Sequence, residues 1–329
     1  MRYTDRIYGS VEIDNLVLLA LLDSKAVKRI QGVLQHGISG LVGITRPTSR
    51  FEHSVGVMLL VRLYGGSLEE QIAALLHDVS HTALSHVIDF VFDSNNSQNY
   101  HERVKAQYMG STDLPAILDQ YGYDWHDFID EERYLLLEQP LPDLCADRLD
   151  YFLRDSIDLK LATSAEATLF LQHLKVHEGQ FVVDNLDTAR WLAYKYMAAD
   201  EMSWANPREV GLSEFTARAI RLAVQSGVIT EDDFWGTDQQ LWQKLCAANN
   251  PELKEQLRFA SSETQFVLDD SAPTFLVSTK LRAVDPKVLN DVRATALSTL
   301  DLDFAAYRSH YLTSNQGKRP IRIIPHPEG

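Results

Sequence analysis

The feature that most constrains this chain is a set of four metal-ligand-type side chains that come from three distant segments. His53 is the first, the pair His77 and Asp78 follows, and Asp147 lies much later. Two imidazoles and two carboxylates, with no thiolate, suit a divalent cation. They can share one ion only if the stretches between them fold back to a common point. Such an ion would activate water and neutralise phosphate charge.

Composition indicates a soluble globular protein with a sizeable core. The chain has 329 residues, of which 45% are hydrophobic and 23% charged. Its formal net charge of −15 argues against a nuclease and against nucleic-acid or membrane partners. An anionic small substrate is still compatible with this charge, since a local basic pocket and a metal can reverse its sign.

Cysteine usage and the N-terminus predict a cytoplasmic location. Cys145 and Cys246 are not in a CxxC spacing, so neither a disulfide framework nor a thiolate metal site is expected. Cys145 is expected to be a small buried side chain. The stretch 1–6 lacks a signal peptide's apolar segment, and no apolar run is long enough to span a bilayer.

Apolar periodicity predicts a mainly α fold with a helical domain over 1–245 and a smaller α+β lobe over 246–329. In the first part we expect a loop at 93–97, a hairpin at 176–183, and helices at 15–22, 24–35, from 49 onward, 68–77, 143–159, 187–202, 213–226 and 232–245. In the second part we expect helices at 251–259 and 286–297, and strands at 274–281 and 320–324.

A dense titratable cluster follows the apolar residues 73–76. On a continuing helix, His77 and His81 would share a face, and His86 and Asp89 are close enough in sequence to touch. A single histidine is more often a satisfied core residue. A run this dense indicates a buried floor with a polar mouth.

A second helical face carries an acid, a phenol and an acid in register: Asp147, Tyr151 and Asp155. Arginine suits phosphate because it donates in a planar fork, although a single arginine more often forms an ion pair. The candidates for phosphate contact are Arg50, Arg148 and Arg154. The pair His101-Glu102 is a weak signal when taken alone.

In this order, the segments resemble the motifs of the HD-domain phosphohydrolases, whose defining pattern is His…His-Asp…Asp. The closer resemblance is to the branch of deoxynucleoside triphosphate triphosphohydrolases. It rests on four stretches, 50–56, 77–86, 100–102 and 147–155, and on similar residues at 7–13, 29–30 and 35–37. It covers residues 5–160. At His36 and over 202–211 the chain departs from this branch, so the resemblance does not extend to the choice of sugar or base.

The resemblance implies a helical HD-domain core, a homo-oligomer and a role for each motif residue. One divalent ion (Mn, Fe, Ni, Zn or Mg) would be held by His53, His77, Asp78 and Asp147. The general acid would be His86, oriented by Asp89, which would raise the fraction of protonated imidazole near neutral pH. The other catalytic side chains would be His81, His101 and Glu102. Substrate contacts would come from Gln35, Arg50, Arg148, Tyr151 and Asp155.

We therefore expect a metal-dependent phosphohydrolase that cleaves (deoxy)nucleoside triphosphates to nucleoside and triphosphate. One alternative is a phosphatase of nucleoside monophosphates or other small phosphoesters. Another is a non-catalytic protein that senses nucleotides on the same scaffold.

Overall fold

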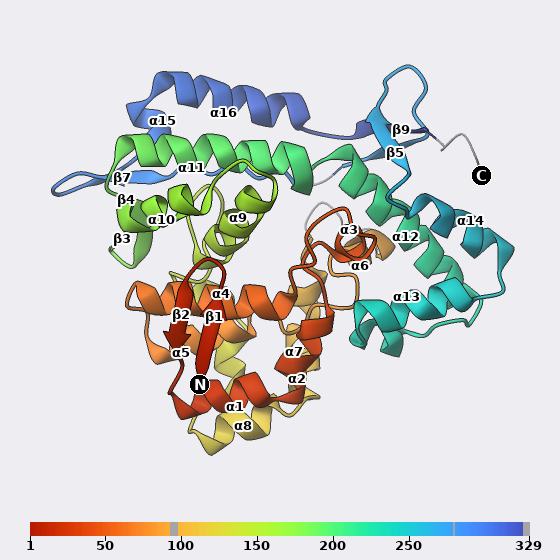
Figure 1. Ribbon diagram of the computed structural model, residues 1–329, viewed down its shortest axis with the longest axis horizontal. Coiled ribbons are helices and arrows are strands. Elements are labelled where there is room, and N and C mark those ends of the chain that lie inside the picture. The colour runs from red at the N-terminus through yellow and green to blue at the C-terminus, as the bar shows by residue number, and fades with distance from the viewer. Residues whose placement is uncertain (93–97, 279, 325–329) are drawn as a thin grey trace.

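Most of the chain is helical, because apolar residues recur at helical spacing and polar side chains cap the helix ends. The computed structural model describes residues 1–92, 98–278 and 280–324, so the loop predicted at 93–97 lies outside the described residues (Figure 1). The longer helices are α1 (Leu16–Asp23), α4 (Arg50–Leu63), α5 (Leu68–Leu76), α7 (Tyr100–Gly110), α8 (Leu114–Gln120), α9 (Ala146–Asp158), α10 (Ser164–His173), α11 (Leu186–Ala199), α12 (Pro207–Gln225), α13 (Asp238–Ala247), α14 (Pro251–Phe259) and α16 (Leu302–Asn315).

Shorter helical pieces join the long ones. They are α2 (Lys25–Arg29), α3 (Gly37–Leu41), α6 (Val87–Val91) and α15 (Leu297–Leu300), with 3-10 turns at Ile30–Gly32, Trp125–Phe128, Glu131–Arg133 and Glu231–Trp235 and a π-helical turn at Asp200–Trp204. The helix predicted at 24–35 therefore breaks, since the chain becomes extended at Val33.

Helix α4 begins at a reciprocal capping box. The Ser49 hydroxyl accepts the Glu52 N–H, and the Ser49 N–H donates to the Glu52 carboxylate. The start of α5 is similar in sequence, and Ser67 caps the Glu70 N–H. The Glu70 carboxylate accepts the Leu136 N–H at 2.8 Å, which anchors the loop before α9 to α5.

Within the described residues, the strands form three small sheets. A hairpin pairs β1 (Arg2–Asp5) with β2 (Gly9–Glu12). A second sheet has the order β3 (Leu174–His177), β4 (Gln180–Val183), β7 (Lys287–Leu289), β8 (Ala294–Ala296), and β4 and β7 are parallel. The third has the order β5 (Gln265–Leu268), β9 (Arg319–Ile324), β6 (Phe275–Val277).

The hairpin predicted at 176–183 is present as β3 and β4, but the helix predicted at 286–297 is wrong. Residues 287–296 form β7 and β8, and only the short α15 follows. The reason is non-local, because β7 pairs with β4, whose backbone groups are available at the edge of the hairpin.

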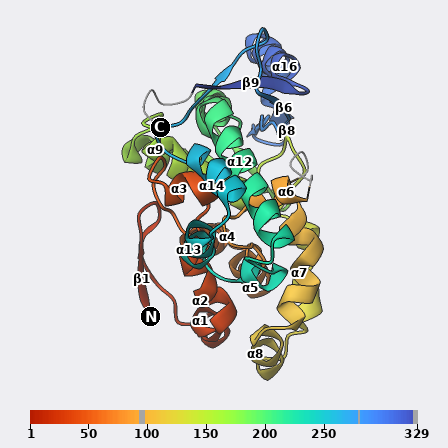
Figure 2. The same cartoon turned by 90° about the vertical axis from the view of Figure 1, so that its right-hand side faces the viewer.

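Two apolar clusters form the core. One packs around α4, α5, α9 and α11, and the other around α6, α12, α13 and the third sheet. Both contain residues from either side of position 245, so the division at that point stays a prediction. Seen from the side, α16 and β9 lie at one end of the molecule and α1 and α8 at the other (Figure 2).

Candidate metal centre and pocket

Three of the four predicted ligand side chains, those of His53, His77 and Asp147, lie together, and Asp78 lies beside them. The Nε2 atom of His53, on α4, lies 2.9 Å from Asp147 Oδ1, on α9, and 3.3 Å from His77 Nε2. The Asp78 carboxylate is 3.6 Å from His77 Nε2 and 3.7 Å from His53 Nε2. Two ligands about 2.0–2.1 Å from one ion lie roughly 3.0–3.4 Å apart. The Asp78 distances of 3.6 and 3.7 Å are slightly longer than this, and the group His53, His77 and Asp147 could hold a cation.

The local backbone differs from the expected helix. Because α5 ends at Leu76, His77 and His81 do not share a helical face. The chain turns there, and His81 Nε2 instead contacts Asp78 Oδ1 at 3.1 Å.

Hydrogen bonds behind the rings aim both imidazoles at the cluster. His53 Nδ1 donates to Asp150 Oδ2 at 2.8 Å, and His77 Nδ1 donates to the Ala74 carbonyl at 2.7 Å. With the hydrogen on Nδ1, each ring turns the lone pair of Nε2 toward the centre. Both Nε2 atoms then face the Asp147 carboxylate, so the nitrogen and oxygen donors of this set fit a divalent metal.

The centre also attracts positive charge. Burial lowers the pKa of His77, but Asp78 and Asp147 beside it raise that pKa to about 10. Burial raises the pKa of Asp147, but hydrogen bonds from His53 and His77 bring it well below its ordinary value. A metal would displace these protons, so its binding depends on pH.

Arg154 supports this centre and is not a phosphate contact. It is fully buried, and its guanidinium donates to Asp150 Oδ2 at 2.7 Å and to Asp5 Oδ2 at 2.8 Å. Asp150 in turn orients His53, so the N-terminal strand β1 braces the metal centre through Arg154.

A pocket of about 600 Å³ opens beside the centre. Of the predicted site residues, His53 and Asp89 lie behind its wall. The others line it: Gln35, Arg50, His77, Asp78, His81, His86, His101, Glu102, Asp147, Arg148, Tyr151 and Asp155.

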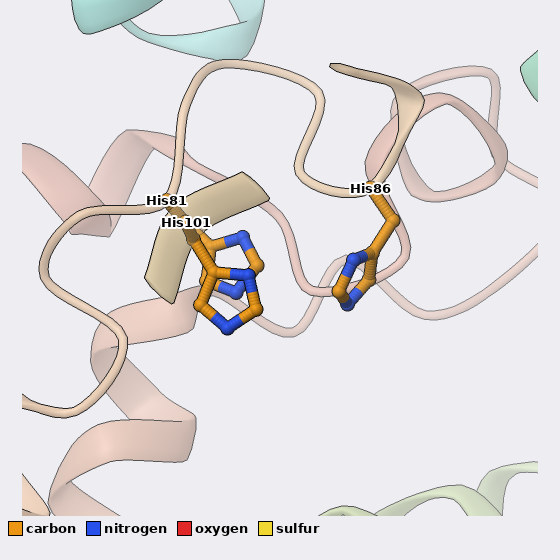
Figure 3. A group of neighbouring side chains, drawn as sticks. All are labelled: His81, His86 and His101. Atoms are coloured by element: carbon orange, nitrogen blue, oxygen red, sulfur yellow. The ribbon is translucent and has the colours of Figure 1, made fainter. Parts of the chain in front are cut away.

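Three histidines that line the pocket, His81, His86 and His101, lie close together (Figure 3). The rings of His81 and His101 stack at 3.8 Å between centroids and 19° between planes, and His86 stands across them. A metal lies in the plane of each imidazole it binds, and nearly parallel planes this far apart do not meet at a coordination distance. The cluster therefore suits contact with an anion better than chelation of a cation.

The pKa of His86 differs from the expectation. Its Nδ1 does bond Asp89 at 3.0 Å. Burial nevertheless lowers the pKa of His86, and the nearby Arg50 adds to this, so the net shift is downward despite Asp89. Burial also brings the pKa values of His81 and His101 well below normal. All three rings are neutral at pH 7 until a bound anion raises their proton affinity.

Several polar pocket residues already have partners. Arg50 pairs with Asp78 at 2.7 Å, and Arg148 pairs with Glu138 at 2.7 Å. Glu102 is more than half exposed and lies 4.0 Å from His101 Nε2, at the limit of an ion pair.

Asp155, predicted to contact the substrate, also has two hydrogen-bond partners within the protein. It accepts a hydrogen bond from His36 Nε2 at 2.9 Å and one from Trp204 Nε1 at 2.7 Å.

Part of the pocket wall was not predicted from the sequence, namely Trp204, Lys280 and Arg282. Two hydrogen bonds hold Arg282 in place. Its backbone N–H donates to Asp200 Oδ2 at 2.8 Å, and its guanidinium donates to Gln98 Oε1 at 2.5 Å. Nothing in the local sequence near 282 signals a site. A π-helical turn at 200–204 is a feature often found at functional sites, but it is not legible in the sequence.

Comparisons with known proteins agree with this geometry. Residues 50–155 match the family described as HD domain. A Cordyceps militaris protein named metal-dependent phosphohydrolase cns2 is 36% identical, over 96% of this chain and 93% of its own length. The chain belongs to the HD-domain metal-dependent phosphohydrolases. Bacillus subtilis YdhJ is 40% identical to this HD-domain chain, over 88% of it and 89% of the relative.

More distant comparisons support the family. A deoxynucleoside triphosphate triphosphohydrolase SAMHD1 homolog of Dictyostelium discoideum is 21% identical, over 97% of this HD-domain chain and 69% of the relative. A crystal structure of a Bacteroides thetaiotaomicron phosphohydrolase has the same fold, with a TM-score of 0.72 and 16% identity over 99% of this chain and all of that one. Among the described residues, no helix is both long enough and apolar enough to cross a bilayer.

Proposed function

We propose that this HD-domain phosphohydrolase cleaves (deoxy)nucleoside triphosphates to nucleoside and triphosphate. The observation that carries the proposal is a nucleotide-sized pocket that combines the metal-ligand cluster with three accessory imidazoles. A volume of about 600 Å³ is within the range for small-molecule sites. Its cationic side chains, which suit a chain of phosphates, are Arg50, Arg148, Lys280 and Arg282. A cytoplasmic location and a homo-oligomer belong to the same proposal.

Each residue then has a defined task. A divalent metal held by His53, His77, Asp78 and Asp147 supplies water activation and charge neutralisation when it is bound. His86 acquires a proton as the anionic substrate raises its pKa, and its Nε2 delivers that proton to the leaving sugar oxygen. Asp89 keeps the ring in place by accepting from Nδ1.

A second candidate is hydrolysis of nucleoside monophosphates or other small phosphoesters. It is favoured by the acids on the pocket wall, because Glu138 already neutralises Arg148 and the run Asp130–Glu132 lies nearby. These charges would repel a long polyphosphate chain. A non-catalytic nucleotide sensor is disfavoured by the complete set of ligand and accessory side chains.

Product analysis decides between these functions. The full chain is incubated with nucleoside tri- and monophosphates and a series of divalent metals, and products are resolved by ion-exchange chromatography. Release of tripolyphosphate supports the proposal, orthophosphate alone supports the second candidate, and nucleotide binding without turnover supports a sensor.

His77→Ala is the matched inactive variant. It should lose bound metal in elemental analysis and lose all turnover. His126→Ala is the control, because His126 is exposed, pairs with the exposed Asp124 and does not line the pocket. It should behave as the wild type.

A further inference from the structure

Asp238, at the first turn of α13, binds the backbone of two separate pocket segments. Its carboxylate accepts the Leu34 N–H at 2.8 Å and the Leu84 N–H at 2.7 Å. Leu34 precedes Gln35 and His36, and Leu84 lies two residues before His86. The side chain is buried, with 2% of the residue exposed, so solvent does not compete for these bonds.

The backbone at Leu84 needs such support. Leu84 and Ser85 both have positive φ, 62° and 50°, which non-glycine residues adopt only where the surroundings impose it. This double left-handed turn sets the direction in which the chain enters α6 and therefore where the His86 ring lies.

The two segments also contact each other at this turn. Ser85 Oγ donates to the Leu34 carbonyl at 2.5 Å and accepts from Arg50 Nε at 3.0 Å. Gly37 packs so closely that a Cβ there would lie 2.4 Å from the Leu84 carbonyl oxygen. Asp238 thus lies behind the contact between these two segments, which carry Gln35 and His36 on one side and His86 on the other.

The stretch before α13 adds further contacts. The Phe234 carbonyl accepts the Ala83 N–H at 2.8 Å. Arg29 donates to the carbonyls of Gly236 at 3.2 Å, Val79 at 2.8 Å and His81 at 2.6 Å. This support lies outside residues 50–155, which match the HD family.

We propose that Asp238 is a positioning residue that fixes the Leu84–Ser85 turn, and with it the His86 imidazole, against the Gln35–His36 segment. The inference rests on the proposed function in taking His86 as the proton donor. Asp238 touches no substrate atom, and it acts only through the backbone bonds it accepts.

The test compares Asp238→Asn with Asp269→Asn in the full chain. Asp269 is a matched control because its carboxylate also accepts two backbone N–H groups, from Ser271 at 2.9 Å and Ala272 at 3.1 Å, and it is absent from the pocket wall. Asp238→Asn should keep its metal content and lower kcat by about 10–10²-fold, the scale of a small misplacement of a reacting group. Asp269→Asn should leave kcat unchanged.

The double variant shows whether the effect passes through His86. If it does, Asp238→Asn should lower the residual rate of His86→Ala by less than about twofold, because the group it positions is gone. An equal loss in both backgrounds, or an unchanged kcat in the single variant, would overturn the inference.

Hydrogen exchange separates this inference from the proposed function. The Leu34 and Leu84 amides should lose protection in Asp238→Asn and keep it in Asp269→Asn, whatever substrate the enzyme uses. Retained protection in a folded Asp238→Asn protein overturns the inference even if nucleotides are hydrolysed. If Asp238→Asn does not fold, Asp238→Glu, which keeps the carboxylate but moves it by one methylene group, replaces it with the same readouts.

Discussion

At the scale of single residues, the imidazoles of the site work in pairs with an acceptor. Asp150 fixes His53, the Ala74 carbonyl fixes His77, and Asp89 fixes His86. The ligand-type residues could be predicted from the sequence because their identity and order are distinctive. Burial could not be predicted from spacing, so the lowered pKa of His86 and the structural role of Arg154 emerged only from the structure.

His86→Ala should keep the bound metal and lower turnover by about 10²–10⁴-fold, the usual scale for a lost general acid. The ring lies outside the metal-ligand set, so elemental analysis should match the wild type while kcat falls. Turnover at the wild-type rate would refute the role of His86.

Asp238 should also leave a signature in the pH dependence of stability. Burial raises its pKa from 3.8 to about 6, despite the hydrogen bonds from Leu84 and Leu34. The folded protein therefore holds this proton more tightly than the unfolded chain. The resulting stabilisation is fully present below pH 4 and is lost as the pH rises through 6, by about 3 kcal/mol.

Urea unfolding at pH 4 and pH 7 checks this shift. The loss of unfolding free energy between these two pH values should be smaller in Asp238→Asn than in the wild type by about 2 kcal/mol. Asp269→Asn should not reproduce this change, because hydrogen bonds from Ser271 and Ala272 lower the pKa of Asp269. An unchanged pH dependence in Asp238→Asn would mean that its carboxyl titrates normally.

At the scale of elements, the close approach of α4 and α9 depends on Gly56. A Cβ at this position would lie 2.1 Å from Arg154 Nη2 and 2.2 Å from Asp150 Oδ1. Glycine inside a helix costs about 1 kcal/mol relative to alanine, so helix propensity gives no reason for it. A glycine is needed because α9, which is distant in the sequence, packs against α4 at this position.

Gly56→Ala should lower the free energy of unfolding by about 1–3 kcal/mol through overpacking, although alanine favours the helix. It should also weaken metal binding, because Asp150 orients His53. Gly110→Ala, at the end of α7, is the control, since the nearest atoms that a Cβ there would meet belong to the Trp125 ring, at 3.1 Å. A Gly56→Ala protein as stable as the wild type would show that α9 can move away without penalty.

The same contrast explains which elements could be predicted. The hairpin at β3–β4 and the helix α9 follow from local pattern, and α4 follows from local pattern and its capping box. Strand β7 could not be predicted from its own residues, because its conformation is set by β4, more than a hundred positions earlier.

At the scale of the whole molecule, the metal centre joins three parts of the chain. Its ligands come from α4, the turn after α5, and α9. A cation that binds only the folded form stabilises it, by about 2.7 kcal/mol at a hundred times its Kd.

Removing the metal with a chelator should therefore lower Tm by a few °C in the wild type and in His126→Ala, as measured by calorimetry. His77→Ala should start at the lower Tm and show no response to the chelator. An equal response in both variants would mean that the chelator acts elsewhere.

The pocket wall at Trp204 and Arg282 lies beyond the stretch that defines the family. Neither residue belongs to the metal-ligand set or is the proton donor, so the signature residues place no direct constraint on them. Relatives with identical signature residues are thus free to diverge in the molecules they accept. An assignment transferred on the signature alone therefore identifies the type of reaction and not the substrate.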